Sequence, residues 1–505
     1  AGVRPADSGR VLLDGADLYQ NLDAFRTVLG YVPQDDIIHT ELPVEATLRY
    51  AAQLRLARDT PADELDRTVE STMSTLDLIA KRDVRVGSLS GGQRKRASIA
   101  VELLTDPQLF FLDEPTSGLD PATAAELTRA MRRLSDSSAT VIFTTHAVQD
   151  LVECDRVVFM ARGGRVAFTG TVEAALQHFG ADRIEGIYQR LAGGISDDAL
   201  ALDDPDPPAG IADDTDVLRI TTFPARTRPG SFRQFVTLTR RTLDTIRHNK
   251  LTLAILVGSP MLVVAMMAVL FRPGAFDFDD PSPTSIVMIL FWVTFGSFFF
   301  GLTYGLLQVC TEQAILRREH LVGLRLTPYL LSKVAVLLPF LVLVNVAMLG
   351  VLRVLDRLPA ADIGDYLSMG FTLTLAAAGA LMLGLLTSAA VGHPSQATLA
   401  LPMLCFPAVL FSGAILPVHQ MADAGAVIST VMLTRLAFEA LGHDLGVRTL
   451  LEDGGSPLGP PLLESYGDAG TSDTVVYWLI LAGFTLVLFV GALLVLRKRC
   501  TNAAR

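Results

Sequence analysis

The pattern of hydrophobic and polar positions divides the chain into two parts. Residues 1–230 mix charged and apolar positions, whereas long apolar blocks joined by short polar stretches begin near Leu251. A helix needs about 20 apolar residues to cross a bilayer. The blocks that reach this length predict six membrane-spanning helices, at 251–271, 285–309, 329–354, 366–391, 397–416 and 474–496.

The distribution of charged residues orients these spans in the lipid bilayer. Arg and Lys gather between the second and third spans and directly after the sixth, whereas the stretch 272–284 and much of 418–473 are acidic. Because basic residues accumulate on the cytoplasmic side, we expect a multi-pass protein of the cell (plasma or inner) membrane with both termini in the cytoplasm.

The residues just before the first span have a different pattern. Residues 231–250 place apolar side chains at helical spacing among arginines, which predicts a basic amphipathic helix at the membrane surface. An ordinary packed helix would show the same pattern. The stretch 195–230 is rich in Asp, Pro and Gly and reads as an acidic flexible linker.

The first part alternates between strand-like and helix-like segments. Apolar runs typical of buried parallel strands lie at 109–112 and 140–143, and residues 28–34 read as a further strand that leads into a loop. Helical periodicity or helix-start signals mark 43–58, 62–80, 90–104 and 121–135. This alternation predicts an α/β domain over residues 1–194.

Composition supports membrane spans and excludes one class of partner. Half of the residues are hydrophobic, and the formal net charge at pH 7 is −11. A nucleic acid held by bulk electrostatics requires an excess of basic residues, so we expect no nucleic-acid partner.

Polar residues that follow the predicted strands indicate phosphate chemistry. Asp113 ends a buried apolar run, where a carboxylate can hold Mg²⁺ beside phosphates. Glu114, the next residue, could polarise an attacking water as general base. His146 follows the next strand, from which an imidazole could reach a γ-phosphate, and Gln34 follows the first strand, from which it could ligate Mg²⁺ or the water.

A second phosphate-binding feature is Ser90-Gly91-Gly92 at a predicted helix start. Backbone N–H groups and the helix dipole favour an anion there. Taken singly, each feature has an ordinary interpretation: a turn, a helix start, or a solvated histidine. Their order along one chain is what indicates a shared function.

In this order the motifs resemble those of the ATP-binding cassette (ABC) transporters. Gln34 corresponds to the Q-loop, 89–93 to the signature motif, 109–114 to the Walker B motif, 117–120 to the D-loop, and His146 to the switch histidine. The continuation of the signature, Arg94-Lys95-Arg96-Ala97-Ser98-Ile99, is similar to that of the G-subfamily (White-type) half-transporters with an ABC-2-type permease.

The resemblance implies a fold, ligands and site residues. The fold is an α/β nucleotide-binding cassette, N-terminally incomplete, followed by a connecting helix and an all-α transmembrane domain with six spans at 251–499. The ligands are ATP and Mg²⁺. The catalytic residues are Glu114 and His146, the ATP-binding residues are Gln34, Ser90, Gly91, Gly92, Gln93, Asp113 and Asp120, and Asp113 and Gln34 hold Mg²⁺.

One part of the nucleotide site is missing from the printed sequence. A phosphate loop of the GxxxxGK[ST] type needs a lysine directly after a glycine. None of the chain's lysines, Lys81, Lys95, Lys250, Lys333 and Lys498, follows a glycine. We expect the Walker A segment upstream of Ala1 in a longer protein, and little or no ATPase activity from this chain alone. A degenerate ATPase is the alternative.

The family's mode of action supplies the expected function. Two copies, as a homodimer, would sandwich ATP so that Ser90, Gly91 and Gln93 contact the nucleotide held by the other copy, and hydrolysis would drive export. The polar joint after the second span resembles a coupling helix, with Glu312, Arg317, Arg318 and Glu319 as its charged residues. A solvated charged loop is the ordinary interpretation.

The cargo and one further segment are interpreted from the same resemblance. Phe295 and Phe299 in the second span and Phe406 in the fifth suggest a hydrophobic or lipid-like cargo, although such residues commonly serve packing. Residues 434–439 look like a re-entrant segment, in which Arg435 and Glu439 could pair. A non-catalytic membrane subunit that lends its signature motif to a partner ATPase, or relays a signal, is the second functional hypothesis.

Overall fold

A computed structural model describes residues 9, 11–13, 16–20, 25, 28–136, 139–192, 229–467 and 470–502. The chain forms two compact units, residues 1–230 with 504–505, and residues 231–503. Almost all of the predicted linker, up to residue 228, lies outside the described residues.

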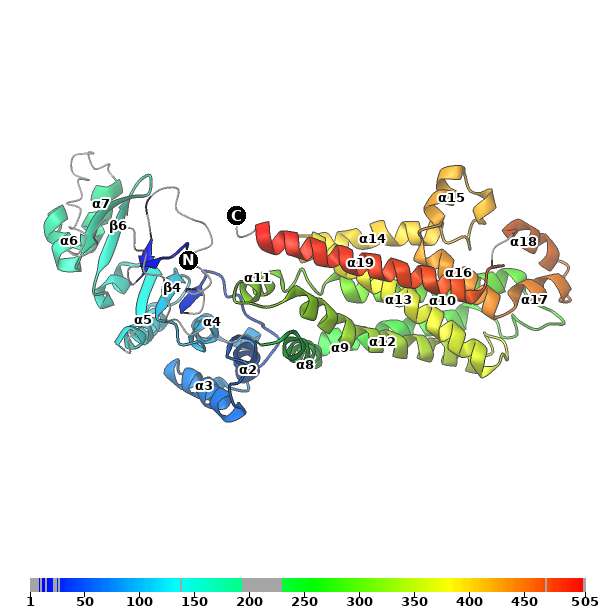
Figure 1. Ribbon diagram of the computed structural model, residues 1–505, viewed down its shortest axis with the longest axis horizontal. Helices are drawn as coiled ribbons and strands as arrows, with labels where there is room; N and C mark the ends of the chain where they lie inside the picture. The colour runs from blue at the N-terminus through cyan, green and yellow to red at the C-terminus, as the bar shows by residue number, and fades with distance from the viewer. Residues whose placement is uncertain are drawn as a thin grey trace. The chain divides into compact units, whose positions relative to one another are not determined.

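The first unit is built on a parallel sheet of β3 (Leu29–Val32), β4 (Leu109–Asp113) and β5 (Thr140–Thr144), in the order β3-β4-β5 (Figure 1). Leu29 pairs with Leu109, and Leu109 with Thr140. Because the strands run in the same direction, their carboxyl ends meet at one edge. The predicted apolar runs are therefore neighbouring strands, as expected for an α/β domain.

The helices of this unit include α2 (Val44–Arg55), α3 (Ala62–Thr75), α4 (Gly91–Leu103) and α5 (Pro121–Asp136); α4 packs against β3, α5 packs against β5, and α2 and α3 pack against α4. The predicted starts are confirmed, because Pro43 and Pro61 are the N-cap residues of α2 and α3. Helix α3 stops at Thr75, short of the predicted 80. The reason is the backbone of Asp77, whose φ of 53° lies in the left-handed region that a right-handed helix cannot contain.

The core of the first unit lies on one face of the sheet. Phe110 and Leu112 of β4 are buried there against α4 and α5 residues. On the opposite face Tyr31, Phe111 and Ile142 stand in register across the strands. The remaining elements are β1 (Leu12–Leu13), β2 (Ala16–Asp17), η1 (Ile79–Lys81), η2 (Val86–Ser88), η3 (Val148–Glu153), β6 (Val157–Ala161), β7 (Arg165–Gly170), α6 (Val172–Phe179) and α7 (Ile184–Ala192).

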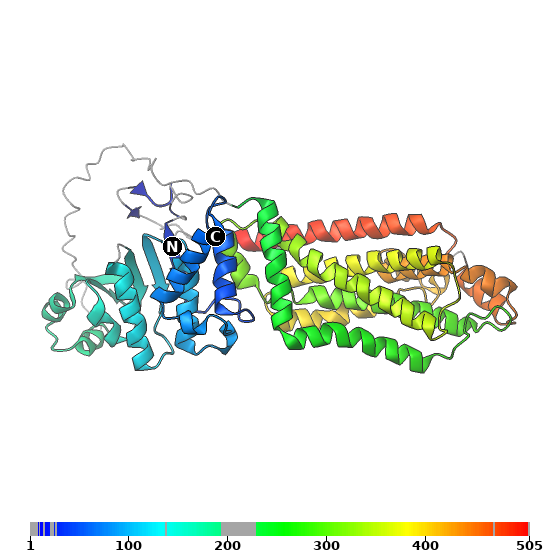
Figure 2. The same ribbon diagram turned by 90° about the horizontal axis from the view of Figure 1, so that it is seen from below.

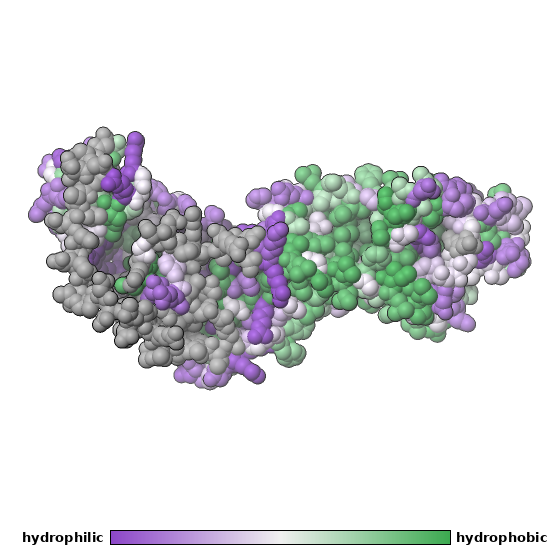
Figure 3. Space-filling model, turned by 45° about the horizontal axis from the view of Figure 1, so that its top comes forward, coloured by the Kyte–Doolittle hydropathy of each residue, from purple (hydrophilic) through white to green (hydrophobic). Residues whose placement is uncertain are grey.

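The second unit is a bundle of long helices that run side by side (Figures 1 and 2). Among the described residues, five helices are long and apolar enough to cross a membrane: α9 (Lys250–Leu270), α10 (Pro283–Leu306), α12 (Leu326–Val354), α13 (Ile363–Ala390) and α19 (Thr474–Asn502). Hydrophobic residues gather over the middle of this unit and hydrophilic residues at its two ends (Figure 3).

The predicted span at 397–416 corresponds to a shorter helix, α14 (Pro394–Leu410). Its 17 residues extend about 25 Å at 1.5 Å per residue, less than the bilayer core of about 30 Å. A bent pair, α15 (Asp423–Ser429) and α16 (Leu433–Asp444), meets at 76° and has the form of a broken span or re-entrant loop. The six-span arrangement therefore stays a prediction.

The two ends of the bundle carry different short helices. At one end lie α15, α16, α17 (Val447–Asp453) and α18 (Gly459–Tyr466), preceded by η5 (Val418–Gln420). At the other end lie α8 (Ser231–His248) and α11 (Gln313–Leu321), and α8 runs across the bundle rather than along it (Figure 2).

A proline in the first long helix explains one polar contact between helices. Pro260 in α9 has no N–H to donate, so the carbonyl of Leu256 one turn earlier loses its intrahelical partner. The hydroxyl of Tyr304 in α10 donates to that carbonyl at 2.6 Å. Tyr304 thereby restores the missing hydrogen bond and joins α9 to α10.

Candidate functional site

Three predicted site residues meet at the carboxyl edge of the sheet. The Gln34 amide Nε2 donates to Glu114 Oε2 at 3.1 Å. The His146 Nδ1 lies 3.2 Å from the other oxygen, Glu114 Oε1. These residues follow three different strands, β3, β4 and β5, so the parallel register is what brings them together. Glu114 is thus held between an amide and an imidazole.

The backbone of Glu114 is held in an unusual conformation. Its φ is 42°, in a region that non-glycine residues rarely adopt. Its N–H donates to the carbonyl oxygen of Thr144 at 3.1 Å and to Thr144 Oγ1 at 3.0 Å. Strained residues held by their surroundings cluster at functional sites, which fits a catalytic assignment for this carboxylate.

Thr144 is a site residue that the sequence reasoning missed. Its hydroxyl donates to Asp113 Oδ1 at 2.7 Å while it accepts from the Glu114 N–H. One side chain therefore fixes both acidic residues of the site. The available signal was a hydroxyl residue at the end of the apolar strand that precedes His146.

The oxygen donors here fit a magnesium ion bound together with phosphates. The described part of the chain contains no group of three or more His, Cys, Asp or Glu side chains that could hold a metal. Mg²⁺ at phosphate sites requires only one or two protein oxygens, because water and phosphate supply the others. The partly exposed Asp113 carboxylate and the Gln34 side-chain carbonyl are donors of that kind.

The signature residues form the start of α4. Ser90 is the N-cap: its Oγ accepts from the Gln93 N–H, and Gln93 Oε1 accepts from the Ser90 N–H at 3.2 Å. Gly92 is required by packing, because a Cβ there would lie 2.1 Å from Thr123 Cγ2. The tight contact places the signature motif against the start of α5.

Asp120 caps that neighbouring helix. Its carboxylate accepts from the Thr123 hydroxyl at 2.6 Å and from the Thr123 N–H at 3.1 Å. These hydrogen bonds from Thr123 lower the pKa of Asp120. Within the described part of the chain, no hydrogen bond of Ser90, Gln93 or Asp120 reaches Gln34, Glu114 or His146.

Lys95 links these two groups of residues. From the second turn of α4 its Nζ donates to the Gln34 carbonyl oxygen at 2.6 Å and to the Pro33 carbonyl oxygen at 3.2 Å. Asp36 Oδ1 lies 3.7 Å from the same Nζ. Burial lowers the pKa of Lys95 and raises that of Asp36. The helix that carries the signature motif is thus tied to the backbone of the Q-loop.

The predicted coupling segment is helix α11 in the second unit, with Glu312 as its N-cap. Glu319 is buried and makes a bidentate pair with Arg241 of α8, at 2.5 and 3.0 Å. Glu312 pairs with the buried Lys333 of α12 at 2.8 Å. The two carboxylates therefore hold α11 to its neighbours.

The other predicted coupling residues and the amphipathic helix complete this region. Arg317 and Arg318 are partly exposed. Gln234 of α8 donates to the Gly323 carbonyl oxygen at 3.3 Å and accepts from the Arg325 N–H at 3.0 Å. Helix α8 is therefore docked on the turn between α11 and α12 at two places.

The pair predicted in the re-entrant segment is confirmed. Arg435 Nε donates to Glu439 Oε1 at 2.7 Å. Tyr477 of α19 donates its hydroxyl to the other oxygen, Glu439 Oε2, at 3.0 Å. The buried carboxylate is thus neutralised on one side and hydrogen-bonded on the other.

Two of the three predicted cargo-path residues lie together. The ring centroids of Phe295 and Phe299 on α10 are 6.1 Å apart. Phe406 on α14 is 66% exposed, in a stripe with Leu399 and Met403. Among the ring contacts of the described residues, none joins Phe406 to the α10 aromatics.

Comparisons with known proteins agree with this two-part architecture. Residues 1–117 match the family model described as ABC transporter, and residues 233–443 match the model described as ABC-2 type transporter. The chain is 33% identical over 435 residues to the ABC transporter ATP-binding/permease protein Rv1747 of Mycobacterium tuberculosis, covering 83% of this chain and 49% of that protein.

Shorter matches extend over about a third of the chain. The chain is 37% identical over 180 residues to the broad substrate specificity ATP-binding cassette transporter ABCG2 of Bos taurus, covering 34% of this chain and 27% of that protein. It is 34% identical over 179 residues to ABC transporter G family member 28 of Arabidopsis thaliana, covering 34% and 16%. The chain spans about half the length of the mycobacterial relative and a smaller share of the other two.

Proposed function

Because the chain belongs to the ABC transporters in which a cassette precedes an ABC-2 type membrane domain, we propose that it works as an ATP-driven exporter. The observation that carries the proposal is the convergence of Gln34, Glu114 and His146, with Glu114 at 3.1 Å from the amide and 3.2 Å from the imidazole. A carboxylate held this way can orient and deprotonate a water that attacks a γ-phosphate.

The residues around Glu114 take the other roles of the reaction. His146 stabilises charge on the γ-phosphate, and Gln34 orients the water. Asp113 and Gln34 would hold Mg²⁺, which would neutralise charge on the phosphates. Thr144 fixes the Asp113 carboxylate and the backbone N–H of Glu114, and Gln34 and His146 hold the Glu114 carboxylate, so that little reorganisation is needed when phosphate charge develops.

The signature residues act on a second copy of the chain in this proposal. Ser90, Gly91, Gly92 and Gln93 begin a helix whose N-terminal N–H groups favour an anion, and Asp120 lies beside them. In a homodimer they would contact the nucleotide held by the partner copy. Lys95 supports this proposal, because its hydrogen bond joins the helix that would contact the partner's nucleotide to the backbone of Gln34, which would contact the chain's own nucleotide.

The membrane unit supplies the transport path and the coupling. The apolar helices of this unit support insertion in the cell membrane, and we infer that both termini face the cytoplasm. The buried pairs of Glu312 and Glu319 join α11 to α12 and α8, so that these helices would move together, and Arg317 and Arg318 would be the remaining coupling residues. Phe295, Phe299 and Phe406 would face a hydrophobic or lipid-like cargo.

The alternative function is that of a non-catalytic membrane subunit. The printed sequence has no lysine directly after a glycine, and such a lysine contacts the β- and γ-phosphates in phosphate loops. A subunit of this kind would lend its signature motif to a partner ATPase. On either reading, this chain alone should hydrolyse ATP slowly or not at all.

The test compares two proteins in lipid nanodiscs. One is the chain as printed, and the other is the same chain preceded by a segment that contains a glycine–lysine phosphate loop. We expect ATP hydrolysis only from the second, abolished by Glu114→Gln with retained ATP binding, and unaffected by Glu126→Gln on the exposed face of α5. If the extended chain binds ATP but never hydrolyses it, the exporter proposal is wrong and the non-catalytic subunit is favoured.

A further inference from the structure

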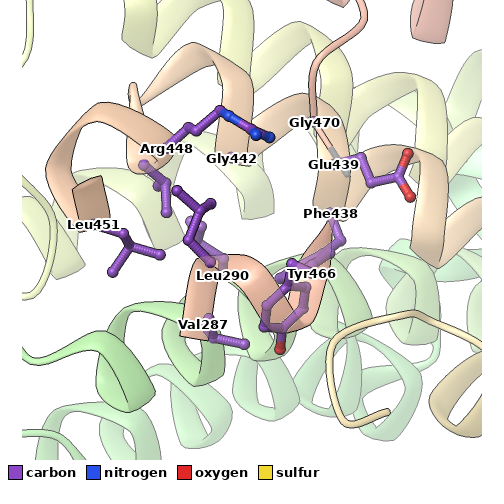
Figure 4. Close-up of a pocket in the computed structure, with 11 residues that line it drawn as sticks. Val287, Leu290, Phe438, Glu439, Gly442, Arg448, Leu451, Tyr466 and Gly470 are labelled. Atoms are coloured by element: carbon purple, nitrogen blue, oxygen red, sulfur yellow. The ribbon is translucent and has the colours of Figure 1, made fainter. Parts of the chain in front are cut away.

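A small cavity lies at the end of the bundle that carries α15 to α18. Its volume is about 60 Å³. Val287 and Leu290 of α10 form one wall, Phe438 of α16 and Leu451 of α17 form others, and Tyr466 of α18 lies beside Phe438 (Figure 4). The walls are therefore apolar and come from four different helices.

One cationic side chain lines this cavity. Gly442 and Gly470 also line it and contribute no side chain. Arg448, which is exposed, is the cationic residue (Figure 4). Arg448 donates to the Gly467 carbonyl oxygen at 3.0 Å, and no carboxylate pairs with it among the residues that the structure describes. Among these described residues, none occupies its remaining N–H groups, which can donate to an anion.

The acidic residue in the lining does not cancel this charge. Glu439 turns its carboxylate away from the cavity (Figure 4). Both oxygens are already used, one by Arg435 and one by Tyr477. The described lining therefore combines an apolar interior with one cationic side chain, Arg448.

The volume decides how much of a ligand can enter. About 60 Å³ holds on the order of five water-sized spheres, far below the ~300–1,000 Å³ of pockets that enclose a drug-sized molecule. A whole sterol or phospholipid cannot fit. A short alkyl segment can.

We propose that this cavity binds an amphiphile that joins a short alkyl chain to an anionic head, with the alkyl chain among Leu290, Phe438 and Tyr466 and the head at Arg448. Fatty carboxylates and anionic lipids share this chemistry. Binding here needs neither nucleotide nor a second copy of the chain, so it stands apart from the proposed transport cycle.

The direct test measures binding to the full chain in nanodiscs of zwitterionic lipid, with empty nanodiscs subtracted. Straight-chain carboxylates from butyrate to decanoate are compared with the primary alcohols of equal length. We expect affinity to rise about four-fold per methylene, the equivalent of about 0.8 kcal/mol, and then to level off when the cavity is full. An unbroken rise through decanoate would indicate simple partition into lipid and overturn the proposal.

Two variants test the contribution of the anionic head to binding separately from that of the alkyl chain. Arg448→Gln should weaken carboxylates by up to about five-fold, as for an exposed ion pair, and leave the alcohols unchanged. Arg272→Gln removes an exposed charge outside the cavity lining and should change neither. Equal losses for carboxylates and alcohols in Arg448→Gln would contradict the assignment of the head.

A third variant fills the cavity without disturbing the fold. Gly442 lies inside α16, and a Cβ there would meet no atom within 4 Å. Gly442→Leu, in protein whose circular dichroism matches that of the unchanged chain, should abolish the chain-length dependence; unchanged binding would refute the site. Replacing part of the nanodisc lipid with phosphatidylglycerol identifies the source of the ligand. If phosphatidylglycerol competes with the soluble carboxylates, the site binds a bilayer lipid. If it does not compete, the site binds a free amphiphile.

Discussion

The buried pair between Arg241 and Glu319 gives the sharpest prediction for the coupling region. Both side chains are almost fully buried, at 5% and 9% exposure, and their atoms are joined at 2.5 and 3.0 Å. Arg241→Met leaves the Glu319 charge buried without its partner. Breaking a buried pair in this way costs about 3–5 kcal/mol, which is about a hundred- to several-thousand-fold in a local opening equilibrium.

The assay is amide hydrogen exchange of the full chain in nanodiscs, read over α8 and α11. Arg241→Met should reduce protection by that factor, and most strongly in the C-terminal half of α8, because Gln234 still holds the N-terminal half to Gly323 and Arg325. Replacing both partners by methionine should return protection close to that of the unchanged chain, since two apolar residues of similar volume leave no stranded charge.

The matched control is an exposed pair in the same chain. Arg67 pairs with Asp63 at 2.7 Å, with both side chains more than 70% exposed. Arg67→Met should cost less than about 1 kcal/mol. The reasoning fails if Arg241→Met is as mild as Arg67→Met, or if the double replacement loses as much protection as the two single ones together.

Further predictions concern the signature motif, the bundle and the start of α5. Gly92→Ala should destabilise the α4–α5 contact by about 1–3 kcal/mol through overpacking, and Thr123→Ser should rescue it by removing the clashing methyl group while keeping the hydroxyl; thermal unfolding of the four proteins measures this. Tyr304→Phe should lower the free energy of unfolding by about 1–3 kcal/mol because it leaves the buried Leu256 carbonyl without a donor. The loss should be much smaller in a Pro260→Ala background, where the restored N–H donates to that carbonyl. Equal losses in both backgrounds would disprove the account. The lowered pKa of Asp120 means that its stabilising effect is present above its ordinary value of 3.8 and is lost as pH falls through the folded value. Hydrogen exchange of α5 should therefore accelerate on acidification, and Asp120→Asn should flatten that pH dependence.

Local sequence patterns predicted which helices and strands are present, but they predicted less well the residues at which these elements end. Prolines at 43 and 61 marked two helix starts because proline suits the first turn and fits poorly in a helix interior. The end of α3 was missed because the left-handed conformation of Asp77 has no signal in its neighbours. The shortness of α14 was missed because an apolar run continues past Leu410 although the helix stops there.

The sequence likewise predicted some residues of the candidate site and missed another. Order and spacing along the chain pointed to Gln34, Asp113, Glu114 and His146, since residues at the carboxyl ends of parallel strands share an edge. Thr144 escaped notice because a threonine at a strand end is common, and its contact with both acidic residues exists only once β4 and β5 pair.

What the sequence determined by itself was everything periodic or local: the apolar lengths of the long helices, the strand and helix alternation, the helix caps, and the i, i+4 pair of Arg435 and Glu439. Tertiary structure alone decided the partners of residues distant along the chain. How separate elements pack decides that Lys95 contacts the Q-loop and that Arg241 pairs with Glu319, 78 positions away. It also decides that Tyr304 supplies the hydrogen bond that Pro260 removes. The type of each residue determines its charge and its hydrogen-bonding groups, but three-dimensional proximity determines which other residue pairs with them.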